Sequence, residues 1–400
     1  MSGRGARLGP ATLALASAAW TSCADGVADT DANGVVDAGA VVDAGAVADA
    51  GDLRDAGALR DGGNVFDAGD VVDAGDLRDA GELRDGGNAG DVVDAGDAGG
   101  DALRPERSLC ASGRVGPIED SGPLGDPALT ETSGLAASWL NPGVLWAHND
   151  SGDAARFFAV GDDGSARGRF VLDDVEAIDV EDVDVALCPD APDVCVWLAD
   201  TGDNARARHA ARLVIVPEPF VDDLAGDPLA ALPAGAALVV PFTYEGGPVD
   251  VEGTVVAADG RRVFLFEKID AAQARVYALA APFVTDGSMV ARVVATLSSP
   301  GLAINLGRAI TAADLHTTGA RLLLRVYTGV FEYRFGAGGE VDDAFASLGA
   351  LSPTQLVFGP LSEPQGEAVA YDHDGRGVFS VSEDPDGRPG RVLHHFPCRP

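Results

Sequence analysis

The chain has 400 residues, and its 63 acidic against 28 basic side chains give a formal net charge of −35. Such a field repels phosphate backbones and anionic lipid head groups, so the composition argues against a nucleic acid partner and favours divalent or basic ligands. The stretch after position 102 holds all five Tyr and three of the four Trp, and its length and apolar content suffice for one large domain.

The first residues have the pattern of an export signal. Arg4 and Arg7 form a short basic segment, an apolar run covers 11–20, and Thr21-Ser22-Cys23 closes it. The apolar run is too short to span a bilayer. A small residue before a cysteine in this place resembles the bacterial lipobox, which implies cleavage before Cys23 and a diacylglycerol on its sulfur. Trp20 departs from the leucine that is usual three residues upstream.

These features predict that 1–23 is a signal peptide and that Cys23 is the lipidation site. The protein is then exported and lipid-anchored at the outer membrane surface or in the periplasm, and the anchor is its only expected contact with a membrane. Two alternatives stay open. An ordinary signal cleaved after 16–18 would give a secreted protein, and the apolar N-terminus could also stay uncleaved.

An acidic repeat follows over residues 24–105. An Asp recurs at every sixth position from Asp31 to Asp91, and Phe66 is the only aromatic residue of 24–102. That stretch has too little apolar bulk to offset the entropy of an ordered chain. Hexapeptide repeats can build a left-handed β-helix, but that fold needs a bulky aliphatic at each corner, where this repeat has mostly Ala and Gly. We therefore expect a disordered Asp-Ala-Gly linker.

Setting Cys23 aside leaves an even number of cysteines, as an oxidising compartment would suggest. Cys188 and Cys195 flank a turn-rich stretch between two strand-like runs, so a local disulfide is geometrically reasonable. Cys110 and Cys398 stand near the two ends of the folded region, and a bond between them would close it into a ring. Four free thiols are the alternative.

Beyond residue 130 the chain consists of short β-rich runs bounded by Gly, Asp, Asn and Pro. Asp-Gly pairs separate many of these runs, and both residues tolerate the positive φ of tight hairpin turns. The clearest runs are 143–147, 156–160, 194–199, 212–216, 262–266, 321–327 and 378–381. Almost no stretch is long and periodic enough for a helix, so we predict an all-β domain over 106–400.

An acidic residue followed by a small or apolar run recurs along this domain. The leading acids are Glu131, Glu181, Glu252, Asp314 and Glu367. Their spacings of 50, 71, 62 and 53 residues suit four-stranded propeller blades. We predict a single β-propeller with five visible blades, and a degenerate sixth blade between Pro217 and Pro241 is the alternative. The segment after Cys110 would add an outer strand to the last blade.

Four motifs carry a resemblance to known proteins: Ser133-Gly-Leu-Ala136, His148-Asn-Asp-Ser-Gly-Asp153, Asp200-Thr-Gly-Asp-Asn204 and Gln365-Gly-Glu-Ala368. At these positions, and over roughly residues 128–398, the chain resembles a group of exported bacterial β-propeller proteins. That group is similar in architecture to phytase-like, esterase-like and gluconolactonase-type propellers. The resemblance implies a site at the mouth of a central channel and the common use of Ca²⁺, without identifying a substrate.

The five leading acids are the first candidate site. In a propeller they begin the innermost strands and form a carboxylate ring, which needs a cation or shifted pKa values because like charges lie close together. A hard divalent ion such as Ca²⁺ is the simplest remedy. The alternative is structural: Glu131, Glu181, Glu252, Asp314 and Glu367 would accept backbone N–H bonds from the neighbouring blade.

Two glycine-containing loops are the second candidate site, because they offer oxygen ligands that can wrap a cation. Their candidate ligands are Asn149, Asp150, Asp153, Asp200, Asp203 and Asn204. The alternative is a network of Asx turns that links the blades. His148 could likewise serve as a general base or ligand, or as a hydrogen-bonded structural residue.

The sequence holds no Gly-x-Ser-x-Gly elbow, no His-Glu-x-x-His zinc motif and no phosphate-cradling Gly-rich loop, so it identifies no catalytic residue. We expect a surface binding or scaffolding propeller, stabilised by Ca²⁺, with an unidentified protein or small-molecule ligand. The alternative is a Ca²⁺-dependent hydrolase of phosphoesters, esters or lactones with its site at the channel mouth. A propeller fold alone does not separate the two.

Overall fold

The computed structural model describes residues 103–172, 174–221, 231–304, 306–336, 339–358, 365–383 and 391–399. The predicted signal peptide, its Cys23 and nearly all of the linker lie outside the described residues. In the described part the helical elements are a short α-helix, α1 (Val341–Ala346), and a 3₁₀ turn at Leu348–Ala350. None of the helices described is long and apolar enough to cross a membrane.

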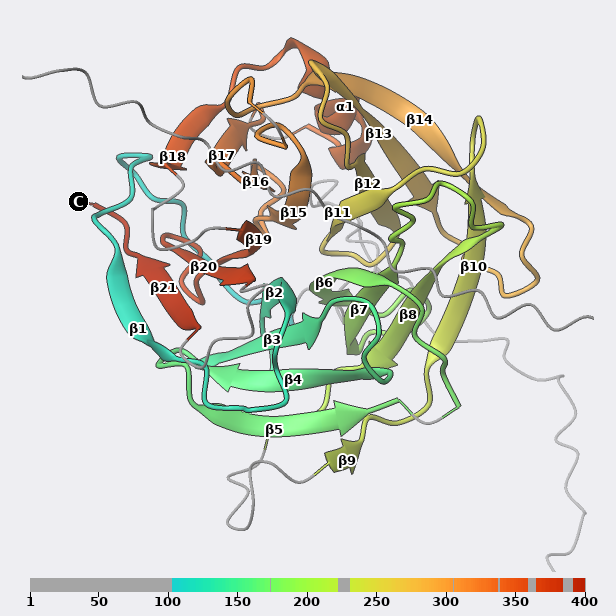
Figure 1. The fold of residues 1–400 in the computed structure, drawn as a ribbon, viewed down its shortest axis with the longest axis horizontal. Coiled ribbons are helices and arrows are strands. Elements are labelled where there is room, and N and C mark those ends of the chain that lie inside the picture. Colours follow the sequence, from blue (N-terminus) through green and yellow to red (C-terminus); the bar gives the residue numbers. More distant parts are fainter. Residues whose placement is uncertain are drawn as a thin grey trace, which may run out of the picture. The chain divides into compact units, whose positions relative to one another are not determined.

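The strands form five blades, each built on a four-stranded antiparallel meander (Figure 1). Blade 1 contains β2 (Thr132–Ala137), β3 (Val144–Asn149), β4 (Arg156–Gly161) and β5 (Ala166–Val171). Blade 2 contains β6 (Val180–Leu187), β7 (Val194–Asp200), β8 (Ala211–Pro217) and β10 (Leu238–Tyr244). Blade 3 contains β11 (Val251–Val256), β12 (Arg262–Glu267), β13 (Gln273–Ala280) and β14 (Met289–Ser298).

Blade 4 contains β15 (Ile310–Leu315), β16 (Arg321–Val326), β17 (Gly329–Arg334) and β18 (Thr354–Phe358). Blade 5 contains β19 (Gln365–Tyr371), β20 (Val378–Glu383), β21 (Val392–Phe396) and, from the start of the domain, β1 (Glu119–Pro123). Each strand-like run singled out in the sequence corresponds to one of these strands within one or two residues.

The five innermost strands form a closed ring around one axis. β2 contacts β6, β6 contacts β11, β11 contacts β15, β15 contacts β19, and β19 contacts β2. Buried apolar side chains form one core cluster between each pair of neighbouring blades, as Trp146, Phe157 and Phe170 do between blades 1 and 2. The predicted all-β propeller with five blades is therefore confirmed.

The insertion between Pro217 and Pro241 forms no sixth blade in its described residues. β10 begins inside it and completes blade 2 by pairing with β8. β9 (Ala231–Pro233) pairs in parallel with β5 at the outer edge of blade 1. β10 also pairs in parallel with β14, which joins blades 2 and 3 in one eight-stranded sheet. The extra chain therefore builds outer edges, and this explains the long spacing between Glu181 and Glu252.

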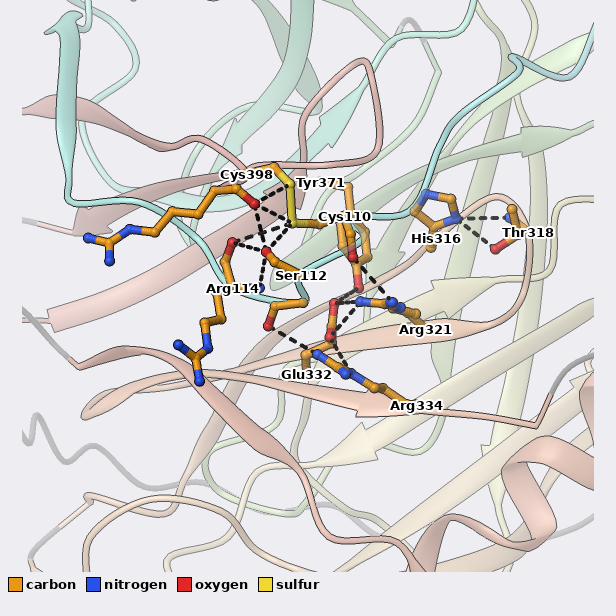
Figure 2. Close-up of polar contacts among 12 residues, drawn as sticks. Cys110, Ser112, Arg114, His316, Thr318, Arg321, Glu332, Arg334, Tyr371 and Cys398 are labelled. Atoms are coloured by element: carbon orange, nitrogen blue, oxygen red, sulfur yellow. Dashed lines mark hydrogen bonds and ion pairs between the residues drawn. A yellow bond between two sulfur atoms is a disulfide. The ribbon is translucent and has the colours of Figure 1, made fainter.

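The first and last described segments close the ring together. β1 pairs antiparallel with β21, as predicted for the segment after Cys110. The disulfides Cys110–Cys398 and Cys188–Cys195, with Cα atoms 5.7 and 5.0 Å apart, confirm both predicted pairs. Figure 2 shows Ser112 beside the first of them, where its hydroxyl donates to the Arg399 carbonyl over 2.6 Å.

A buried carboxylate joins blades 4 and 5 near this closure. Glu332 of β17 accepts hydrogen bonds from Arg321 at 3.0 Å and from Arg334 at 2.9 Å. It also accepts one from the Tyr371 hydroxyl of β19 at 3.3 Å (Figure 2). The charge of this carboxylate, 4% exposed as a residue, is thus balanced by two guanidinium groups.

Replacing both Cys110 and Cys398 by Ser is expected to lower the free energy of unfolding by about 2 to 5 kcal/mol, because their bond closes almost the whole domain. The double Ser variant of Cys188 and Cys195 is the matched control, and its loss is expected to be smaller because the closed loop is short. Urea unfolding followed by tryptophan fluorescence measures both. Equal losses would contradict the closure argument.

Candidate functional site

Every innermost strand carries a bulge near its start. The pairing of each inner strand with the second strand of its blade skips one residue, and these bulge residues are Ser133, Glu181, Glu252, Thr311 and Glu367. A bulge redirects the side chain of the extra residue. Three blades therefore place a glutamate at the same position around the axis, and the other two place a hydroxyl residue there.

Two of the predicted leading acids do not share that position. Glu131 stands two residues before the bulge of β2, and its side chain is exposed. Asp314 stands three residues after the bulge of β15 and is buried. The five acids are thus at three heights along the axis, and only Glu181, Glu252 and Glu367 are equivalent. A bulge has no signature in the sequence, so the alignment of acid to acid missed the true register.

The inner strands begin at one end of the axis, which we call the entry end, and the acids gather there. Asp179 and Asp250 stand two residues before the bulges of β6 and β11, and Asp150 follows the end of β3. Two groups of carboxylate oxygens converge, each with all its oxygens within 4.8 Å of one another: Asp150, Asp179 and Glu181, and Glu181, Asp250 and Glu252. These five residues form the acid cluster.

The donor set of the acid cluster fits a hard divalent cation. Ca²⁺ binds oxygen ligands at about 2.3 to 2.6 Å, so two ligand oxygens on opposite sides of one ion are about 5 Å apart. Each group of three meets this limit. Glu181 is 3% exposed as a residue, and its carboxylate lies against that of Asp179, with a side-chain hydrogen bond between the two acids. One Asp179 oxygen, Oδ1, is also buried without a hydrogen-bond partner.

Burial and mutual repulsion disfavour the charged forms of these acids. Burial, followed by the charge of Asp150, raises the pKa of Asp179 to about 6. Burial and the neighbouring Glu252 hold the pKa of Glu181 well above its usual value. Burial also raises the pKa of Glu367, on the next blade but one, to about 7. A divalent ion at this end of the axis would reverse these shifts, because it stabilises the ionised forms.

In both predicted loops, one side chain accepts backbone N–H groups from the segment before an inner strand. Asn149 Oδ1 accepts the backbone N–H groups of Thr130 and Glu131 at 2.7 and 3.0 Å. Asp200, one blade on, accepts those of Ile178 and Asp179 at 3.3 and 3.0 Å. Each side chain therefore fixes the segment that leads into an inner strand. For Asn149 and Asp200 this matches the structural alternative, a hydrogen-bonding Asx role, rather than cation binding.

Most of the other loop candidates also have protein partners. Asp153 pairs with Arg156 at 2.6 Å, and Asp203 accepts the backbone N–H groups of Ala207 and Arg208 at 2.8 and 2.9 Å. Asp200 is also ion-paired with Arg208 and Arg212, at 2.8 and 2.5 Å. Asn204 is exposed, and only Asp150 joins the acid cluster.

His148 is a buried structural residue with one free nitrogen. Its Nδ1 is 2.9 Å from the Asn149 carbonyl oxygen, while Nε2 has no partner among the described residues. Burial lowers the pKa of its imidazole to about 4, so the ring is neutral. A Cβ atom on Gly134 would lie 2.4 Å from Nε2, so the glycine of the Ser-Gly-Leu-Ala motif makes room for this ring.

The acids further along the axis are satisfied by protein groups. Asp182 is fully buried, and its Oδ2 accepts N–H groups from Thr254 of blade 3 and Ala313 of blade 4, at 2.8 and 3.1 Å. Asp184 accepts from Val256 at 2.6 Å, and Asp314 accepts from Tyr371 at 2.5 Å. For Asp314 the structural alternative therefore describes its contacts, since it bonds the neighbouring blade.

An arginine from the N-terminal segment lies at this far end of the axis. The charge of Arg107 interacts with those of Asp314 and Asp184, and its Nη2 donates to the Ala137 carbonyl at 3.3 Å. Ser108 donates its backbone N–H to the Asp374 backbone carbonyl at 2.9 Å, which fixes the segment beside Arg107. Far-end acids thus have a cation and backbone donors, whereas the three acids Asp150, Asp179 and Glu181 have no ion pair among the described residues.

A cavity of about 180 Å³ lies between the loop after β7 and the segment after β10. Thr201, Asp203, Arg208, Tyr244 and Val249 are among its lining residues, and no member of the acid cluster is. The cavity borders the acid cluster, because Asp203 donates its backbone N–H to Asp250 Oδ1 at 2.9 Å.

Comparisons with known proteins give solved structures of low similarity and no matching family. No family model matches the chain, and no curated protein matches it. Solved structures that are similar include U3-55K (15% identity, 66% of this chain and 67% of that chain, TM-score 0.32) and the WD40 repeats of RRP9 (14%, 67% and 67%, 0.34). A gluconolactonase from Xanthomonas campestris is similar at 11% identity, over 70% of this chain and 89% of that chain, with a TM-score of 0.37.

Replacing Glu367 by Gln tests the shifted pKa. The folded pKa of about 7 exceeds the unfolded value of about 4.3, so the folded state holds a proton that the unfolded chain releases between these values, and the unfolding free energy falls as the pH rises through this window. The advantage of E367Q over the unaltered protein should therefore grow by about 1 to 3 kcal/mol from pH 5 to pH 8, measured by urea unfolding with chelator present. E131Q, at an exposed site, is the control, and an equal slope in both variants would contradict the shift.

Proposed function

We propose that this protein is an exported, lipid-anchored β-propeller that holds a calcium ion in the acid cluster and uses that end of its axis as a binding surface. One observation carries the proposal: the carboxylates of Asp150, Asp179 and Glu181, from two blades, converge, and no lysine or arginine of the described residues is ion-paired with them. An ion there offers free coordination positions to an external ligand, because Ca²⁺ takes six to eight oxygens and three residues supply only some of them.

The contrast with the far end of the axis supports this proposal. Asp182, Asp184 and Asp314 are buried too, but each accepts a backbone N–H group from a neighbouring inner strand. A buried carboxylate with such donors is a structural element, whereas a buried carboxylate facing other carboxylates is destabilising unless a cation or proton joins it. Glu181 faces other carboxylates, and we therefore propose that an external cation binds it.

Export and anchoring rest on different observations. The lipobox-like end of residues 1–23 and the Asp-rich repeat support a tethered protein, and the two disulfides agree with an oxidising compartment. The loop motifs at 148–153 and 199–204 support membership of the exported propeller group that they resemble. Because the comparisons stop at the fold, the ligand of the surface is proposed only by class, as an anionic or polar group that completes the coordination of Ca²⁺.

Calcium should raise the melting temperature of the full chain by about 5 °C when its concentration is about 100 times the dissociation constant, since binding then adds about 2.7 kcal/mol. D179N and E181Q should each weaken binding about tenfold or more and remove the shift, because each loses a charged ligand. Thermal unfolding in calcium and in chelator gives the result. The matched control is D259N, an exposed turn acid, and an unchanged shift in D179N would reject the site.

A Ca²⁺-dependent hydrolase of phosphoesters, esters or lactones is the second candidate, and the side chains beside the cluster favour it. Lys268 and Tyr327 lie against each other at the entry end, with 5.6 Å between Nζ and the ring centre, and Lys268 is ion-paired with Glu252. Lys268 would place a fixed positive charge beside a cation-polarised substrate. Turnover of generic esters, lactones or phosphoesters that requires calcium and is lost in D179N would establish it, and a screen without turnover would leave the binding module.

Anchoring predicts a measurable modification at the N-terminus. In a bacterial host that processes lipoproteins, the mature chain should begin at Cys23 with a diacylglycerol on its sulfur and should partition with membranes. C23S should move to the soluble fraction. Mass spectrometry of the N-terminal peptide and membrane fractionation give both results, and unmodified Cys23 in a membrane-bound chain would contradict the lipid anchor.

A further inference from the structure

The two groups of the acid cluster share Glu181, so the cluster has room for two adjacent cations bridged by one carboxylate. Asp150 and Asp179 stand on one side of Glu181, and Asp250 and Glu252 stand on the other. Two-cation sites of this kind occur in proteins that bind phosphate esters and related anions. Whether both groups take an ion depends on what else faces them.

The two groups differ in their protein partners, because Asp250 Oδ1 accepts the backbone N–H of Asp203 at 2.9 Å and a lysine faces Glu252. Lys268, which directly follows β12, makes an ion pair with Glu252, and its backbone N–H donates to the Asp250 carbonyl at 2.9 Å. Its side chain is 17% exposed, so the ammonium is largely withdrawn from water. Among the described residues, no lysine or arginine makes a comparable contact with Asp150, Asp179 or Glu181. One group therefore holds a protein cation, and the other holds none.

The surroundings of Lys268 keep it charged and in place. Its ammonium group is paired with the Glu252 carboxylate. The Tyr327 ring lies beside the ammonium at 5.6 Å, a distance at which a cation is attracted to the face of an aromatic ring. The backbone bond to Asp250 fixes the start of the side chain. Lys268 is thus held by its acid partner, by the ring and by the main chain.

We propose that Lys268 is a built-in cation that occupies the Glu181–Asp250–Glu252 group, so that the acid cluster takes one divalent ion, at Asp150, Asp179 and Glu181. Its ammonium pairs with Glu252, one of the three ligands of that group, and its positive charge also acts on Asp250 and Glu181. A divalent ion in the same group would compete for Glu252 and meet like-charge repulsion from the ammonium. This inference rests on the proposed calcium site. It adds that the site takes one ion and that Lys268 sets this number.

Removing the ammonium should open the second group. K268M keeps the apolar stem of the side chain and loses its charge, so titration calorimetry of the full chain with CaCl₂ alone should count one more ion than in the unaltered protein. The acidic linker is present in both variants, so its weak binding cancels in the comparison. K268R, which keeps a cation there, is the matched control and should bind the same number of ions as the unaltered protein.

A second pair of variants decides the question even if K268M does not fold. D179N should lower calcium affinity about tenfold or more, whereas D250N should lower it less than about threefold, because only the first removes a ligand of the occupied group. Equal losses in D179N and D250N, or an equal count of ions in K268M and K268R, would overturn the role of Lys268 while leaving the calcium site standing. Absence of any specific ion in all variants, including the unaltered protein, would instead overturn the proposed function.

Discussion

Convergence of five innermost strands on one axis is the constraint on which the rest of this structure depends. Closing the ring brings equivalent positions of β2, β6, β11, β15 and β19 together, although they lie 48 or more residues apart in the chain. Any polar side chain at such a position then meets its counterparts in a region withdrawn from water. Acids at the starts of these strands therefore repel one another when buried, and they can also form one site from several blades.

The protein deals with its axial acids in two ways. Asp182, Asp184 and Asp314 accept backbone donors across blade boundaries, and Arg107 adds a positive charge near two of them. Such contacts add polar connections to the apolar cores between neighbouring blades. At the entry end, Asp150, Asp179 and Glu181 face one another instead. Both kinds of acid occur in one strand. In β6, Glu181 belongs to the acid cluster, whereas Asp182 and Asp184 accept backbone N–H groups.

The sequence predicted the blades because each strand leaves a local pattern of apolar runs and turn residues. It also predicted both disulfides, whose partners could be paired from their places in that pattern. It could not predict the register of the inner strands, because the bulge at Ser133 or Thr311 depends on contacts with the next strand. Asp179, Asp250 and Lys268 were missed for the same reason: with the correct register, the first two are equivalents of Glu131, and the third follows β12 as Asp150 follows β3.

The N-terminal segment joins the propeller at the end of the axis opposite the acid cluster. Arg107 and Ser108 contact Ala137 and Asp374, which lie where β2 ends and just after β19, so this segment reaches the far end of the axis. The acid cluster lies at the other end, where the same strands begin. If the preceding linker is a tether, its attachment and the acid cluster are separated by the length of an inner strand. Among the described residues, the proposed ion-binding surface and the segment that carries Arg107 are therefore at opposite ends of the axis.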